Sequence, residues 1–268
     1  MIGRASPRRG LVLLALASLA ATLVVVTARV ERASAERTQS GNLVFSLDGR
    51  ISPLRLPRDH PAPVSVHLAG SLRTDDDSTL PRMNRMEIGL PQQGVIDARG
   101  LPTCPPRRLR SATTAGALDA CRDALVGHGR LRADVILPDQ SPLSIDTTLL
   151  AFNSRVDGRR ALVVHAFGKG VPVAVVIPFM FERSDDRLGR LLVARLPRAL
   201  GPWPRLASFE LTLSRRFEYR GRRHSYLSAS CPIPKALTAG FFSLARAGFT
   251  VVGGGHIGTA ITRGCRGR

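Results

Sequence analysis

Lysine is nearly absent from this sequence. Only Lys169 and Lys235 are lysine among 39 basic residues, and the formal net charge is +19. The coding bias of a high-GC genome replaces lysine by arginine, but it does not explain the excess of basic over acidic residues. We therefore expect affinity for an anionic partner, either cell-wall polymer or a membrane surface.

A second long apolar run is also missing, which excludes a multi-pass membrane protein. The one such run, Leu11–Ala28, follows several arginines and precedes the small-residue box Ala33–Ala35. These three features together are typical of a secretory signal. We therefore predict a signal peptide over residues 1–35 and one exported domain over residues 36–268.

An uncleaved membrane anchor over residues 11–28 is the alternative. The run has 18 residues, near the lower limit for crossing a bilayer, and charged residues separate it from the cleavage box. In either case we expect the domain to be secreted or otherwise extracytoplasmic. Export makes nucleic acid a poor partner, and one Trp and two Tyr offer few surfaces for stacking bases.

Four cysteines occur, an even number that in an exported chain indicates disulfide bonds. No CxxC spacing is present, so a zinc ribbon is not expected. Three pairings are open, and we favour the local one, in which Cys104 bonds Cys121 and Cys231 bonds Cys265. Loop-closure entropy gives each such bridge about 3–4 kcal/mol.

Strand patterns dominate the rest of the chain. Several segments alternate apolar and polar residues, whereas Ala161–Phe167 and Val171–Phe181 are apolar on both faces and indicate central strands. One helix is expected, capped by Thr113 or Thr114 and ended by Gly127. The fold class predicted is therefore all-β, a β-sandwich or flattened barrel with one short helix.

No catalytic or cofactor-binding motif is supported by the sequence around it. The segment Gly253–Gly258 matches GxGxxG, but only ten residues follow it, so a hairpin turn is expected instead of a dinucleotide site. No HExxH, GxSxG or SxxK occurs. His67 and His165 lie in strands and are the histidines that could meet in space. We assign no catalytic, cofactor-binding or metal-ligating residue.

One acidic and one basic cluster of side chains could bind ions. The acidic run Asp75–Asp77 lacks the Gly and Glu of a calcium loop, so we interpret it as a solvated turn, with a weak calcium site as the alternative. A basic cluster flanks Phe217 and Tyr219 and is our candidate for binding phosphate or uronate groups. Its members are Arg215, Arg216, Arg220, Arg222 and Arg223.

Short segments also carry a resemblance. They are Gly100–Cys104, Leu125–Gly129, Ala151–Asn153 and Tyr226–Pro232, with Cys265 near the C-terminus. Together they are similar to a group of secreted, β-rich proteins of high-GC actinobacteria for which no activity is known. The resemblance implies an exported β protein and implies nothing about mechanism.

Two functions from different classes follow. The first is an exported cell-envelope or extracellular protein with a non-enzymatic binding or scaffolding role towards anionic polymer or lipid. The second is a secreted hydrolase whose site is assembled from residues distant in sequence. A concave pocket with a carboxylate pair or a His–carboxylate pair favours the hydrolase, and a flat basic surface without such a pocket favours the binder.

Overall fold

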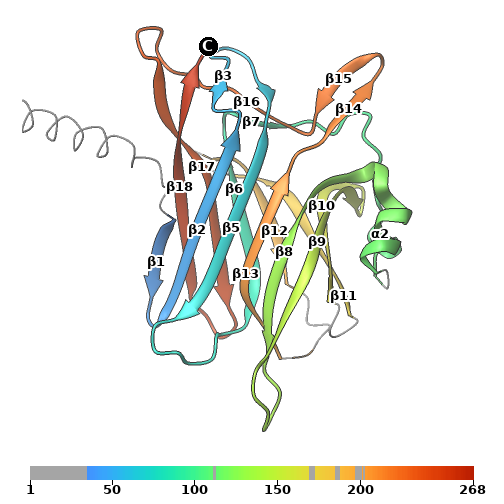
Figure 1. The fold of residues 1–268 in the computed structure, drawn as a ribbon, viewed down its shortest axis with the longest axis vertical. Helices are drawn as coiled ribbons and strands as arrows, with labels where there is room; N and C mark the ends of the chain where they lie inside the picture. The colour runs from blue at the N-terminus through green and yellow to red at the C-terminus, as the bar shows by residue number, and fades with distance from the viewer. Residues whose placement is uncertain (1–34, 111–112, 169–172, 185–187, 197–200, 202) are drawn as a thin grey trace, which may run out of the picture. The chain divides into compact units, whose positions relative to one another are not determined.

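One large, curled β-sheet forms most of the protein (Figure 1). The computed structural model describes residues 35–110, 113–168, 173–184, 188–196, 201 and 203–268. Within them, 13 strands are hydrogen-bonded in the order β1-β2-β5-β13-β8-β9-β10-β11-β12-β6-β17-β18-β3. Two small sheets, β14-β15 and β4-β16-β7, complete the fold. The signal or anchor predicted over residues 1–35 lies almost entirely outside the described residues.

The strand bounds follow the predicted alternation closely. The strands are β1 (Glu36–Ser40), β2 (Leu43–Ser52), β3 (Arg55–Leu56), β4 (Ala62–Pro63), β5 (Ser65–Thr74), β6 (Met83–Pro91), β7 (Gly94–Ile96), β8 (Leu125–Val135), β9 (Leu143–Val156), β10 (Arg159–Gly168), β11 (Ala174–Arg183), β12 (Leu188–Arg195), β13 (Pro204–Leu213), β14 (Arg216–Tyr219), β15 (Arg222–Ser225), β16 (Leu227–Ala229), β17 (Ala239–Val251) and β18 (His256–Gly267). The all-β prediction is confirmed. The strands form one curled sheet and not two separate stacked ones.

The two ends of the large sheet come together, because β1 and β2 lie beside β18 (Figure 1). Arg263 on β18 joins them: its Nε donates to the Gly49 carbonyl at 2.7 Å, and its Nη2 donates to Asp48 Oδ1 at 2.6 Å. Gly49 itself has no side chain because Ile261 of β18 occupies the space that a Cβ would need. This close approach makes one face of the sheet concave and encloses an interior.

Every second residue of the strands faces the interior, and these side chains form the main core. Phe45 of β2, Phe209 of β13 and Phe249 of β17 meet edge to face, with ring centroids 5.3 and 6.3 Å from the Phe249 ring. Phe45 and Phe249 are fully buried. This aromatic cluster packs the part of the interior near the joined ends of the sheet.

A second, smaller core lies on the outer face of β9 and β10. The helix α2 (Thr114–Cys121) covers it, and Ala161 and Val163 of β10 are fully buried there. The Cys104–Cys121 disulfide holds this layer in place. The apolar pattern on both faces of β10 is therefore explained: even-numbered residues face the interior and odd-numbered residues face the helix layer. The helix covers a face in the middle of the sheet and not its edge.

The helix is shorter than predicted. Thr113 caps it as expected, accepting a hydrogen bond from the Gly116 backbone N–H at 3.1 Å. It then ends at Cys121, and the 3₁₀ turn η2 (Arg122–Ala124) leads directly into β8. The prediction that the helix runs to Gly127 is wrong, because the segment from Leu125 pairs with β9 and is extended as a strand.

The second disulfide closes the C-terminal end of the molecule. Cys231 bonds Cys265 of β18, so the local pairing is confirmed at both bridges. Disulfides persist in oxidising compartments, so the two bridges indicate an extracytoplasmic protein.

A further 3₁₀ turn, η1, spans Pro106–Arg108. In the described part of the chain, no helix combines the length and apolar character that a membrane span requires.

Replacing Arg263 tests how far the fold depends on the joined ends. We expect Arg263→Gln to lower the free energy of unfolding by about 1.5–3 kcal/mol, because hydrogen bonds to charged groups contribute that much. Arg266→Gln, an exposed arginine on the same strand, is the matched control and is expected to stay within about 0.5 kcal/mol. Urea denaturation measures both. Equal stability of the two variants would show that the ends stay joined without Arg263.

A candidate ligand cavity and its surroundings

The concave face of the sheet encloses a cavity of about 430 Å³. It lies towards the end of the sheet that holds the β8–β9 and β17–β18 hairpins, opposite the C-terminus (Figure 1). Seven strands, from β5 through β6 and β8 to β11 and β13, contribute to its wall. The apolar residues that line it are Leu68, Met83, Met86, Ile88, Leu131, Ala133, Val135, Leu137, Leu143, Ile145, Leu149, Leu162, Val164, Ala166, Val173, Val175, Ile177, Phe179, Leu196, Pro204, Leu206, Phe209, Leu211 and Val252.

The wall of this cavity is exposed in an unusual way for a protein interior. Leu131, Ile145 and Val175 face inward, yet they are only half-buried because no side chain fills the space in front of them. At the rim, Leu143 is 51% and Val252 is 40% exposed. Large apolar surfaces of this kind mark binding sites, since a monomeric protein otherwise buries them.

The strand sequences explain why the interior stays hollow. Small residues such as Ala133 and Ala166 stand at inward positions on the wall of the cavity. Alternation alone determines which residues face inward, and a cavity forms wherever their summed volume is less than the space that the curled sheet encloses. A volume of about 430 Å³ lies within the range of small-molecule sites.

Polar side chains at the cavity are few. Arg82 and Asn84 lie at the start of β6, and Thr147 is on β9. Arg205 follows the lining residue Pro204 on β13 but is not itself a lining residue, and its cross-strand neighbour is Asp134 of β8. Burial, and then the nearby charge of Arg82, lower the pKa of the Arg205 guanidinium below its ordinary value. Arg82 is therefore the basic side chain that the wall of the cavity offers to an anion.

The arginine cluster predicted for anion binding lies elsewhere, on the β14–β15 hairpin. Arg216, Arg220, Arg222 and Arg223 are exposed there, and Arg215 is half-buried just before β14. One of the accompanying rings contacts an arginine, because the Arg220 guanidinium lies over the Tyr219 ring, 5.3 Å from its centroid. The Phe217 ring stacks on His224 with centroids 5.5 Å apart, and both Phe217 and Tyr219 are half-buried. Binding of an anion at this hairpin stays a prediction.

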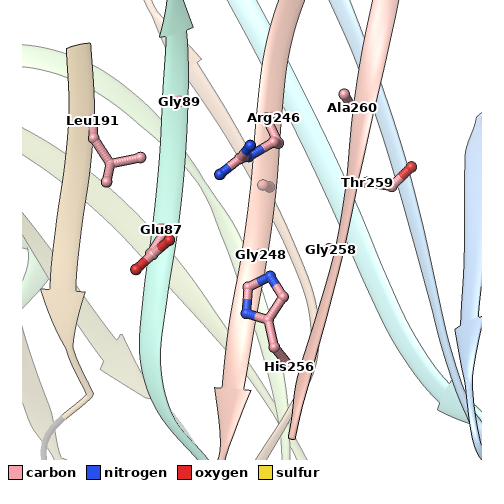
Figure 2. Close-up of a pocket in the computed structure, with 10 residues that line it drawn as sticks. Glu87, Gly89, Leu191, Arg246, Gly248, His256, Gly258, Thr259 and Ala260 are labelled. Atoms are coloured by element: carbon pink, nitrogen blue, oxygen red, sulfur yellow. The ribbon is translucent and has the colours of Figure 1, made fainter. Parts of the chain in front are cut away.

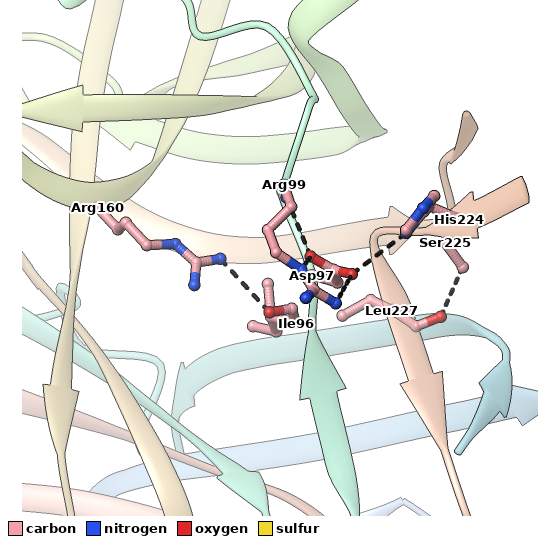
Figure 3. Close-up of polar contacts among 7 residues, drawn as sticks. All are labelled: Ile96, Asp97, Arg99, Arg160, His224, Ser225 and Leu227. Carbon is pink, nitrogen blue, oxygen red and sulfur yellow. Dashed lines mark hydrogen bonds and ion pairs between the residues drawn. The ribbon is translucent and has the colours of Figure 1, made fainter. Parts of the chain in front are cut away.

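A polar cluster attaches this hairpin to the body of the protein (Figure 3). Asp97 accepts hydrogen bonds from the Nε and Nη2 of Arg99 at 3.0 and 2.9 Å, and from the Arg99 backbone N–H at 3.0 Å. His224 Nδ1 lies 3.4 Å from Asp97 Oδ2, the oxygen that also accepts from Arg99 Nη2. Hydrogen bonds from Arg99, with a smaller part from His224, hold the pKa of Asp97 well below its usual range despite partial burial.

This His–carboxylate pair does not have the geometry of a hydrolase site. The nearby Ser225 hydroxyl donates to the Leu227 carbonyl at 2.7 Å and not to His224 (Figure 3). Neither Asp97 nor His224 lines the apolar cavity. A nucleophile, its base and an orienting acid must form a connected series of hydrogen bonds, and this cluster does not supply one. The hydrolase alternative stays a prediction without a site in the described residues.

A shallow groove of about 370 Å³ lies on the outer face of β6, β17 and β18 (Figure 2). Its floor is made of the glycines Gly89, Gly248 and Gly258. The His256 ring lies against Gly248, in space that a Cβ there would occupy. Glu87 at the rim is paired with Arg85 at 2.6 Å. The groove is open to solvent and floored by backbone, so it offers little selectivity for a ligand.

The other residues considered from the sequence are separated in the fold. His67 on β5 contacts Thr212 Oγ1 at 2.9 Å, whereas His165 is fully buried on β10, with three strands between β5 and β10. The idea that they meet is wrong. Asp76 accepts hydrogen bonds from Asn42 and Ser78. No cluster of three or more metal-ligating side chains occurs among the described residues.

Comparison of the chain with protein-family models, with curated proteins and with solved structures finds no match. The site must therefore be interpreted from its own geometry. Sequence reasoning missed the cavity, although it had identified most of the strands that form it.

The acid dependence of stability tests the Asp97 cluster. We expect Asp97→Asn to destabilise the protein by about 1.5–3 kcal/mol at pH 7, since Asp97 accepts hydrogen bonds from the charged Arg99 side chain. The folded pKa of Asp97 lies below the unfolded value of about 4, so its contribution is complete above pH 4 and is lost as the pH falls towards the folded value. The gap between wild type and variant should therefore narrow below pH 4.

Urea denaturation at several pH values measures this gap. Asp119→Asn is the control, because Asp119 forms a solvent-exposed pair with Arg122 at 3.5 Å. This variant is expected to match wild type throughout. A gap for Asp97→Asn that is constant from pH 7 to pH 2 would contradict the assignment of a charged, hydrogen-bonded Asp97.

Proposed function

We propose that this protein is an extracytoplasmic, non-enzymatic lipid-binding protein that holds an acyl chain inside its curled sheet. The observation that carries the proposal is the cavity itself: it holds about 430 Å³, is walled by aliphatic side chains and is exposed to solvent at Leu143 and Val252. Burial of each methylene from water contributes about 0.8 kcal/mol, so such a wall favours a long hydrocarbon over a polar polymer. The lipid alternative of the original hypothesis is therefore preferred to the cell-wall polymer.

The dimensions suit a single lipid tail. Along β10 the lining residues run from Leu162 to Gly168, a span of about 20 Å at 3.3 Å per residue. One leaflet of the hydrocarbon core of a bilayer is about 15 Å thick. A full-length acyl chain thus fits between the opening and the closed end, with its headgroup left at the rim.

The charge of Arg82 supports an anionic headgroup. Arg82 lines the cavity at the start of β6, so a carboxylate or phosphate at the rim would lie near its guanidinium group. Hydrogen bonds from arginine to a carboxylate or phosphate are stronger than those between neutral groups. The ligand class we propose is an anionic amphiphile with at least one long acyl chain.

Filling the cavity tests this function. We expect the purified protein to bind cis-parinaric acid, a fluorescent fatty acid, and to release it when palmitate is added. Ala133→Phe should weaken palmitate at least tenfold, because the ring occupies the space of the chain. The control Ala260→Phe adds the same ring to an exposed position on the outer face of β18 and should bind normally. No binding of either fatty acid by wild type would refute the proposal.

Removing one charge at the rim tests the headgroup. Arg82→Gln is expected to weaken palmitate about 3- to 10-fold, the effect of losing one charge-assisted hydrogen bond. The same variant should bind the uncharged alcohol of equal chain length as wild type does. Isothermal titration calorimetry with both ligands separates the two cases. An equal loss for acid and alcohol would mean that Arg82 shapes the cavity and does not contact the anion.

A further inference from the structure

A second, smaller cavity of about 70 Å³ adjoins the first. The two share four wall residues, Leu68, Ile88, Leu162 and Leu211. These aliphatic side chains therefore lie between the two cavities. A chain held in the larger cavity reaches the smaller one where these side chains move apart.

Tyr226 lines the smaller cavity and is only 1% exposed. Its hydroxyl is buried and makes no hydrogen bond within the described residues. Burial raises the pKa of Tyr226 well above its ordinary value, although the charge of Arg160 opposes the shift, so the hydroxyl keeps its proton and remains a donor. An unpaired buried hydroxyl is costly and is rare in native proteins.

Water is a poor partner for this hydroxyl. A buried water molecule is stable when it makes two to four hydrogen bonds to polar groups. Apart from Tyr226, Ser228 is the one residue with a polar side chain on the wall of the smaller cavity, and the others are apolar or glycine. The partner is then best supplied by a molecule that is itself largely apolar and carries one oxygen atom.

We propose that the ligand carries an oxygen atom near the buried end of its acyl chain, which accepts a hydrogen bond from the Tyr226 hydroxyl. This inference rests on the proposed lipid-binding function and narrows its ligand class to chains with a distal hydroxyl, keto or ester oxygen. A zigzag carbon chain advances about 1.25 Å per bond, so the span of about 20 Å corresponds to about 16 carbons. The distal oxygen is therefore placed at or beyond that distance from the headgroup.

A pair of ligands that differ by one atom tests the proposal. Wild type is expected to bind ω-hydroxypalmitate roughly 3- to 10-fold more tightly than palmitate, in displacement of cis-parinaric acid. Tyr226→Phe should bind palmitate at least as well as wild type and should lose the preference. Tyr219→Phe, which changes the other tyrosine of the chain outside both cavities, should keep it.

The outcomes separate the two proposals. If wild type binds palmitate and ω-hydroxypalmitate equally, the distal-oxygen proposal is overturned while lipid binding stands. If wild type shows the preference and Tyr226→Phe retains it, the hydroxyl is not the donor and the proposal is likewise overturned. If wild type binds neither ligand, both proposals fail. Because the wild-type comparison alone decides the first case, the test does not depend on the folding of any variant.

Discussion

The meeting of β18 with β2 is the constraint on which the rest of this structure depends. An open sheet of 13 strands has two solvated faces, whereas this sheet has an inside because its ends approach each other. The guanidinium of Arg263 and the missing side chain of Gly49 permit that approach. Once the ends are fixed, strand alternation determines which side chains line the interior, and hence that the interior is aliphatic.

One part of the interior is filled by side chains, and another part is hollow. Three phenylalanines fill the region near the joined ends, whereas small and aliphatic residues leave space along β8 to β11. Native interiors are normally packed as densely as organic crystals. The proposed function therefore depends on the hollow region and not on a polar cluster. The arginines of the β14–β15 hairpin, which the sequence pattern predicts to bind an anion, do not contribute to it.

Much of the fold could be predicted from sequence, because alternation and apolar runs are local signals. The central position of β10 follows from them. The local pairing favoured among three for the cysteines is confirmed, as is Thr113, one of the two expected helix caps. What could not be predicted depends on distance in space. Helix propensity beyond Cys121 is overridden by pairing of Leu125 with β9, and the cavity exists only through the curvature of the whole sheet. Tyr226 likewise gives no local sign that its hydroxyl is buried without a partner.

The helix layer on β9 and β10 has a consequence for how the molecule deforms. These two strands are packed on both faces, and β9 hydrogen-bonds the Cys104 segment that the disulfide joins to α2. Val176 and Met180 of β11 extend the same small core, whereas no residue of β12 belongs to it. Local opening starts where fewest buried contacts must be broken, so β9 and β10 are expected to open later than β12.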